Sequence, residues 1–332
     1  MLLKTREDIR KWLRENGVKN YRIANNLIVN VNSDVKIENL KITKLPVVFG
    51  KVKGNFDISN NSLISLEGCP KEVEGFFACR NNNLIKLKGC PTKVKESFYC
   101  DENQLVSLDG CPIEVECFDC SRNNLTSLKG SPQIVRESFR CSNNKLVDLI
   151  NGPLVVGEKY TCSYNSLVSL NGLPSNLPKL EARKNKLKNL IGCPTVMAYL
   201  NVNGNEITSL IGCPRIIEYD LYLFKNKITS FKHISKEVGG IIDLTNNPIE
   251  EILLEDLPEK VVEEIDFTLN DLKVDVLLNH FQEEIKINNS DKIRRNIKLD
   301  VLEKLIKSDT MKKVLEKELF QENKPIAKKL KI

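Results

Sequence analysis

The sequence repeats itself every 20 or 21 residues, and this period constrains the fold more than any other feature. Leucine or isoleucine recurs in step at Leu63, Leu84, Leu105, Leu125, Leu146, Leu167, Leu187, Ile207, Ile228 and Ile249. An asparagine stands two residues before each of them, at Asn61, Asn82, Asn103, Asn123, Asn144, Asn165, Asn185, Asn205, Asn226 and Asn247, and Asn270 extends the column. A period of this length predicts a solenoid of stacked units that bury their apolar faces against one another.

A short alternating segment lies upstream of each asparagine, as in Phe98-Tyr99-Cys100 and Ile242-Asp243-Leu244. Alternation with a period of two predicts a strand with one buried face. Parallel strands of successive units lie about 4.8 Å apart, so about eleven turns would form a rod roughly 55 Å long. The asparagine that follows each strand can pair with backbone groups that the bend leaves without partners.

These residues resemble the leucine-rich repeat, whose core reads L-x-x-L-x-L-x-x-N-x-L, and Phe98, Cys100, Asn103 and Leu105 fill its last four fixed positions. The L-x-x-L-x-G-C-P that follows, as in residues 63–70, is similar to the short bacterial type of repeat. Its Gly-Cys-Pro corner is similar to repeats encoded by large tailed phages. The resemblance implies an α/β repeat solenoid, a curved rod of about eleven 20–21-residue turns with parallel concave strands.

Three regions follow from the pattern. Residues 1–34 are expected to form an N-terminal cap of a short helix and a strand, and residues 35–270 the repeats, with Leu40 in the asparagine's place in the first of them. After Asn270 the apolar spacing becomes helical, so residues 271–332 are expected to form a C-terminal helical cap or bundle with a basic tail.

The N-terminal cap has the signals of a short helix. Thr5 is the expected N-cap and Gly17 the expected stop, while Ile9, Trp12 and Leu13 share one face that would pack on the first turns. The prolines on the far side of each unit predict an extended or turn-like outer segment, because about ten residues cannot hold a helix and two corners.

Composition excludes several classes of protein. The formal net charge of +6, from 50 basic and 44 acidic side chains, is far from the concentrated basic field of a dedicated nucleic-acid binder. The sequence shows neither an apolar signal-peptide core nor a stretch of roughly 20 apolar residues. We therefore expect a cytoplasmic protein, in the host cytoplasm if phage-encoded, with no membrane contact and with free thiols at its 11 cysteines.

The sequence contains few candidate catalytic residues, and we expect neither an enzyme nor a cofactor. The two histidines, His233 and His280, are interpreted as surface or packing residues. Cys117 and Cys120 form the single C-x-x-C, but Cys120 belongs to a core column and no second ligand pair lies at suitable spacing, so no metal site is expected. The other cysteines recur with the repeat, which favours packing.

A ligand of such a rod would meet the strand residues that point away from the core. Register predicts one such residue per turn, at Asp57, Ala78, Tyr99, Asp119, Arg140, Thr161, Glu181, Asn201, Tyr222, Asp243 and Asp266. Exposed aromatic and arginine side chains are enriched at protein-binding hot spots. The candidate partner-binding residues, from this row and its flanks, are Phe76, Arg80, Tyr99, Arg140, Lys159, Arg183, Tyr199, Tyr222 and Phe224.

The sequence therefore favours a non-catalytic scaffold that binds a protein partner on its concave face. The phage resemblance implies a host or viral protein as partner, including a component of host defence. The alternative is a nucleic-acid-associated protein that uses the basic C-terminal segment; the mixed charges of the concave row argue against nucleic acid on that face.

Overall fold

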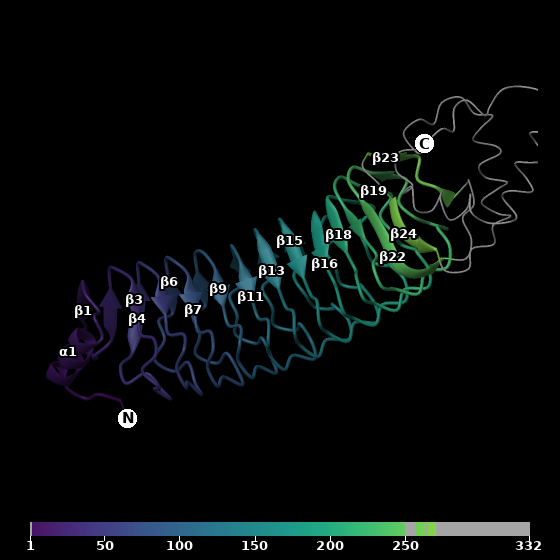
Figure 1. Cartoon of the computed structure of the whole chain (residues 1–332). Helices are drawn as coiled ribbons and strands as arrows, with labels where there is room; N and C mark the ends of the chain where they lie inside the picture. The colour runs from purple at the N-terminus through teal and green to yellow at the C-terminus, as the bar shows by residue number, and fades with distance from the viewer. Residues whose placement is uncertain (1, 250–255, 263–264, 270–332) are drawn as a thin grey trace, which may run out of the picture.

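The computed structural model describes residues 2–249, 256–262 and 265–269, which form one curved stack of coils (Figure 1). Its main element is a twelve-stranded sheet, called here the long sheet, in which neighbouring strands are parallel and follow chain order. The strands are β3 (Val35–Lys36), β5 (Phe56–Asp57), β7 (Phe77–Ala78), β9 (Phe98–Tyr99), β11 (Phe118–Asp119), β13 (Ser138–Arg140), β15 (Lys159–Thr161), β16 (Lys179–Glu181), β18 (Tyr199–Asn201), β20 (Leu221–Tyr222), β22 (Ile242–Ile249) and β24 (Ile265–Leu269). Twelve successive strands enclose the eleven turns that the repeat predicts.

Three shorter sheets line another side of the stack. The first contains β1 (Tyr21–Ile23), β2 (Val29–Val31), β4 (Phe49–Val52), β6 (Glu72–Val73) and β8 (Lys93–Val94). The second contains β10 (Glu114–Val115), β12 (Ile134–Val135) and β14 (Val155–Val156). The third contains β17 (Val196–Met197), β19 (Ile216–Ile217), β21 (Glu237–Val238) and β23 (Lys260–Val261). The outer segments are therefore extended, as the sequence predicts.

A proline explains one break between the shorter sheets. After β14, the Gly157 N–H donates to the Val135 carbonyl and continues the ladder. Pro178 follows the corresponding buried position of the next coil, Leu177. Proline has no N–H, so that bond cannot form, and the second sheet ends there while the long sheet continues through β16.

The asparagine column forms the predicted ladder. Asn82 is 6% exposed, and its Nδ2 donates to the carbonyls of Ile58, Cys79 and Arg80 at 3.1, 3.2 and 3.0 Å. Its Oδ1 accepts the Leu63 N–H at 2.9 Å. The same pattern recurs at Asn103, Asn123, Asn185, Asn226 and Asn247. One amide per coil thus pairs backbone groups of two coils that the bend would leave unsatisfied.

The interior is filled by columns of identical side chains. Aromatic rings stack along the rod from Phe49 to Tyr160, with neighbouring centroids 4.9–6.0 Å apart. Cysteines fill the narrower column two residues later, at Cys79, Cys100, Cys120, Cys141 and Cys162, each fully buried and free. Because each unit contacts only its neighbours, this continuous filling takes the place of a central core.

The N-terminal end of the stack begins with a helix. Helix α1 (Arg6–Glu15) begins after Thr5, whose hydroxyl accepts the Asp8 N–H, and buries Ile9 and Leu13 against the first coils. Leu40 lies at the asparagine's position of the first coil, since the β3–β5 register steps by 21 residues, but its side chain is 42% exposed and takes no part in the ladder. Its backbone N–H donates to Asn61 Oδ1 of the next coil at 3.0 Å.

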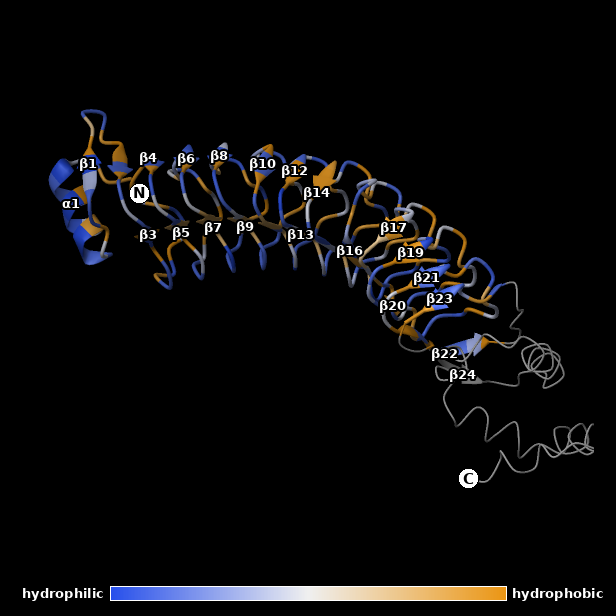
Figure 2. Ribbon diagram, turned by 90° about the horizontal axis from the view of Figure 1, so that it is seen from above, coloured by the Kyte–Doolittle hydropathy of each residue, from blue (hydrophilic) through white to orange (hydrophobic). Residues whose placement is uncertain are grey.

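The stack bends smoothly, and Figure 2 shows the long sheet toward the inner side of the bend with the shorter sheets along its outer side. The strand-to-strand register steps by 20 or 21 residues from Lys36 to Asp243, so one residue per coil is aligned along the inner surface. The predicted C-terminal helices at 271–332, and Asn270, lie outside the described residues.

Candidate functional site

The outward row is the set of long-sheet side chains that point away from the core, from Asp57 to Asp243. Strand pairing aligns its members as the repeat predicts, for example Tyr99 beside Ala78 and Asp119. Most are half-buried, but Ala78 and Asn201 are only 2% and 7% exposed, contrary to expectation. Ala78 is a single methyl group between longer neighbours, and Asn201 is covered by the Tyr199 hydroxyl, to which its Nδ2 donates at 3.1 Å.

Four residues on strands β7 and β9 and their flanks form an N-terminal cluster on this surface. The Arg80 guanidinium lies over the Tyr99 ring at 3.9 Å from the centroid. Its Nε donates to Asp101 Oδ1 at 2.9 Å. Phe76 meets the edge of the Tyr99 ring, with centroids 6.1 Å apart. A cation–π contact, an ion pair and a ring contact therefore hold Tyr99 and Arg80 in one arrangement before any partner arrives.

Asp101 is the most perturbed carboxyl group of the outward surface. Its pKa is raised from 3.8 to about 6, mainly by burial and also by the neighbouring Asp119 carboxylate, while Arg80 opposes the change. The side chain is only 19% exposed, which agrees with burial as the dominant cause. The charge of this cluster therefore changes around pH 6, where the folded Asp101 carboxyl group titrates.

Arg140 stands alone in the middle of the outward row. Arg140 lies half-buried on β13, between Asp119 and Thr161 of the neighbouring strands. Within the described part of the chain its guanidinium has no ion-pair partner. Its positive charge is therefore available to an acidic group of a partner.

A second cluster covers β15, β16 and β18. Glu181 accepts from Lys159 Nζ at 2.7 Å and from Arg183 Nη2 at 3.3 Å, so one carboxylate orders two cationic side chains. The Tyr199 and Tyr222 rings lie side by side with centroids 5.7 Å apart. The Tyr222 hydroxyl donates to Asp220 Oδ2 at 3.3 Å, and burial together with this carboxylate raises the pKa of Tyr222.

A hollow of about 510 Å³ opens beside the second cluster, lined by Lys159, Lys179, Glu181, Tyr199, Tyr219, Asp220, Gly239 and Gly240. Two glycines line it. A Cβ on Gly240 would overlap Asp220 Oδ1, and that oxygen accepts the Ile241 N–H. The hollow is within the size range of pockets that receive one side chain or a small ligand.

The nine predicted partner-binding residues all lie on the outward surface or its flanks. The structure brings together Phe76, Arg80 and Tyr99 in the first cluster, and Lys159, Arg183, Tyr199 and Tyr222 in the second. Arg140 lies between the clusters, and half-buried Phe224 follows β20. The sequence interpretation missed Tyr219, Asp220 and the Gly239-Gly240 pair; the paired glycines, which occur at this place in no other coil, were the available signal.

The C-x-x-C cysteines point to different sides of the stack. Cys120 is buried in the core, whereas half-buried Cys117 lies on the outward flank and its thiol donates to Glu137 at 3.0 Å. His233 is an exposed turn residue, and His280 lies outside the described residues.

In the described ranges no group of three or more histidine, cysteine or carboxylate side chains could hold a metal ion, and no helix has the length and apolar character needed to span a bilayer.

Neither a protein-family model nor a curated protein matches the chain. Among solved structures, the fold is similar to YopM from Yersinia enterocolitica WA-314, with 20% identity over 72% of this chain and 67% of that chain and a TM-score of 0.45. It is also similar to YopM from Yersinia pestis, described as a leucine-rich effector protein, with 18% identity over 72% and 87% and a TM-score of 0.43. Both likenesses concern the repeat architecture, which the strand register here establishes by itself.

Proposed function

We propose that the chain is a non-catalytic scaffold that binds a protein partner on the outward surface of the long sheet. The observation that carries the proposal is the ordering of large side chains that the core does not use. Tyr99, Arg80, Tyr199 and Tyr222 are held by ring and cation–π contacts and by hydrogen bonds, with one another and with neighbouring Phe76 and Asp220. Aromatic and arginine side chains of this kind dominate protein-binding hot spots.

Rigidity supports the same proposal. The outward surface is built on strands that are paired on both sides from β5 to β22, so binding there orders little additional backbone. The ion pairs around Glu181 and Asp101 already restrict the long cationic side chains. A preordered surface loses less conformational entropy on association than a flexible one.

The charge of the surface favours a protein over nucleic acid. Carboxylates interrupt the basic residues along the outward row and its flanks, at Asp57, Asp101, Asp119, Glu181, Asp220 and Asp243. A nucleic-acid groove needs a continuous basic stripe to neutralise phosphates. The alternative function, a nucleic-acid-associated protein, would instead use residues 271–332. For the preferred function, the phage resemblance suggests a host or defence protein of the cytoplasm as the partner.

The test begins with capture of partners on the immobilised full-length chain, followed by titration of each purified candidate. We expect Tyr99→Ala, Arg140→Glu and Tyr222→Ala each to weaken binding by about thirtyfold, the effect of losing a hot-spot residue. Ile113→Ala is the matched control, because Ile113 is a 73% exposed apolar residue just before β10, away from the long sheet.

Each variant must keep the melting temperature of the parent chain, so that a binding defect reports the surface and not the fold. The proposal is wrong if the three variants bind like the parent while a chain shortened to end near residue 320 loses binding. Binding that falls steeply with added salt would then favour the nucleic-acid alternative.

A further inference from the structure

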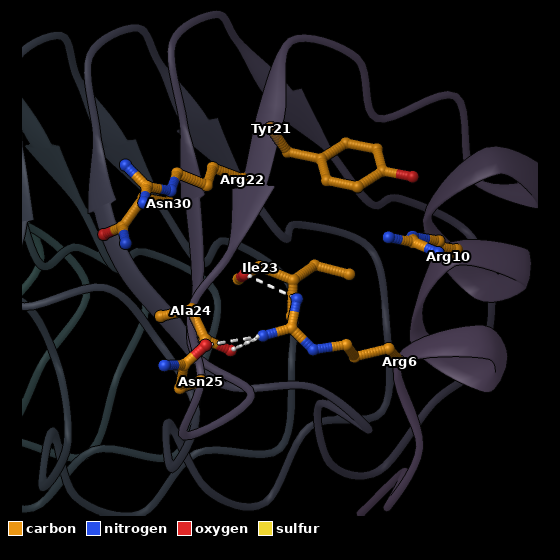
Figure 3. Close-up of a pocket in the computed structure, with 8 residues that line it drawn as sticks. All are labelled: Arg6, Arg10, Tyr21, Arg22, Ile23, Ala24, Asn25 and Asn30. Atoms are coloured by element: carbon orange, nitrogen blue, oxygen red, sulfur yellow. Dashed lines mark hydrogen bonds between the residues drawn. The ribbon is translucent and has the colours of Figure 1, made fainter.

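A second cavity lies at the N-terminal end of the rod, between helix α1 and the β1–β2 hairpin. Its volume is about 600 Å³, and Figure 3 shows the side chains around it: Arg6, Arg10, Tyr21, Arg22, Ile23, Ala24, Asn25 and Asn30. We propose that this cavity binds the phosphate or pyrophosphate group of a small molecule. The site is separate from the outward surface of the long sheet and does not depend on the function proposed for that surface.

Arg6 forms a fixed wall of the cavity. Its Nη1 donates to the Ile23 carbonyl at 3.1 Å, and its Nη2 donates to the Ala24 carbonyl and to Asn25 Oδ1 at 3.1 and 3.0 Å (Figure 3). These three bonds tie the first turn of α1 to the end of β1. The cavity is therefore held open by the fold, and a ligand would not need to order its walls.

Two more arginines border the cavity from different elements. Arg10 lies one helical turn after Arg6 and extends from α1 toward the hairpin, whereas Arg22 extends from β1 toward Asn30 (Figure 3). Among the described residues neither guanidinium has an ion-pair partner, and both side chains belong to exposed residues. Two cationic residues without counter-charges thus line the cavity, one from α1 and one from β1.

The neutral polar groups of the cavity also present donors. Asn25 Oδ1 is used by Arg6, and Asn30 Oδ1 accepts the Lys51 N–H at 2.8 Å. Because both amide oxygens are occupied, the amide nitrogens are the groups left to face a ligand. The Tyr21 hydroxyl, which points toward α1 in Figure 3, can donate as well.

Charge then selects the class of ligand. Three guanidinium groups line the cavity and no carboxylate does, so its lining carries three positive charges. A single carboxylate would neutralise one of them, whereas a phosphate dianion or a pyrophosphate can match two or three. Guanidinium groups also bind phosphate oxygens in a two-pronged geometry that a lysine cannot provide.

The experiment is a calorimetric titration of the full-length chain with pyrophosphate, and with inorganic phosphate and ADP to distinguish a free anion from a phosphorylated small molecule. We expect saturable binding of one equivalent. Arg10→Gln and Arg22→Gln should each weaken it by at least about tenfold, the effect of losing one charge-assisted contact. Among the described residues neither guanidinium group has a hydrogen bond or an ion pair, so both variants should keep the parent melting temperature.

Arg14→Gln is the matched control, because Arg14 lies on the same helix but does not line the cavity. It should bind pyrophosphate like the parent. An equal loss in all three variants would overturn the proposal, since it would show diffuse attraction to a basic helix. Absence of saturation at millimolar pyrophosphate, or equal affinity for acetate, would overturn it too, and so would tight binding of an oligonucleotide by a chain that ignores pyrophosphate.

Discussion

At the scale of single residues, the asparagine column shows how one side chain can replace a backbone partner. The Asn82 amide makes four hydrogen bonds that link two coils, and its removal leaves buried carbonyl and N–H groups without partners. For Asn82→Ala we expect the free energy of unfolding to fall by about 1–3 kcal/mol in a urea titration.

Asn83→Ala is the matched control for that change. Asn83 is exposed, has ordinary backbone angles, and its amide contributes one long contact, accepting from Gln104 at 3.3 Å. The residue before the ladder position would be a poor control, because Asn81 and Asn143 have left-handed φ angles that alanine tolerates badly. Equal unfolding midpoints for the two variants would show that the ladder is not structural.

Asp101 provides a prediction about pH. Its pKa of about 6 in the fold exceeds the ordinary 3.8, so the folded state holds a proton that the unfolded state has released. The stability of the parent chain should therefore fall as pH rises from about 4 to about 6 and stay level above. Relative to Asp101→Asn, which cannot titrate, this loss amounts to at most about 3 kcal/mol.

The measurement is a set of urea titrations of both chains from pH 4 to pH 7. The Asp101→Asn change also removes the ion pair with Arg80, which alters the free energy of unfolding by an amount unrelated to titration. The informative quantity is therefore how the difference in unfolding free energy between the two chains varies with pH. Exposed Glu158→Gln controls for the removal of one negative charge. A difference that stays constant across this range contradicts the burial of Asp101.

At the scale of elements, α1 is a separable part of the stack. The Thr5 hydroxyl accepts the Asp8 N–H at 3.1 Å and donates to the Asp8 carboxylate at 2.6 Å. Thr5→Ala should therefore destabilise the helix by about 1 kcal/mol. Hydrogen exchange should report faster opening of α1 while β15 to β18 keep their protection, because each coil contacts only its neighbours.

Exposed Thr126→Ala serves as the control for Thr5→Ala, since Thr126 lies in the middle of the rod and outside any helix. Uniform loss of protection along the whole chain would mean that the rod opens as one cooperative unit. That result would contradict the nearest-neighbour description of the stack.

At the scale of the whole molecule, the core is one continuous column from Ile9 to Ile265. It shields thiols along the rod, and burial raises the pKa of Cys79, Cys100, Cys120 and Cys141 well above the ordinary range. Because the thiolate is the reactive form, these cysteines should resist alkylation in the native protein. Half-buried Cys117, on the outward flank, should be labelled first.

Mass spectrometry after timed alkylation checks this order, with the unfolded protein as the control in which all 11 cysteines react. The second cysteine column is less protected than its periodicity suggests, since Cys69 and Cys90 are buried but Cys111, Cys193 and Cys213 are only half-buried. Rapid native labelling of the Cys79 to Cys162 column, or intact disulfides within it, would contradict the described core.

The sequence by itself determined the periodic part of this protein. Each unit repeats the same inward residues, so the period, the strand register and the asparagine ladder could be predicted from local spacing alone. Ala78 and Asn201 show where that reasoning fails: alternation assigns the direction of a side chain, but the neighbouring coil decides whether it is covered.

Only the tertiary structure decided which outward residues act together. The Arg80 contact with Tyr99, the sharing of Glu181 by Lys159 and Arg183, and the hollow at Gly240 each join residues of different coils. The arginine cavity likewise joins a helix to a hairpin that the repeat does not include. Such groupings depend on distances between side chains of neighbouring coils. The spacing of residues in the sequence predicts which strands align, but it does not predict the side-chain conformations that bring particular residues into contact.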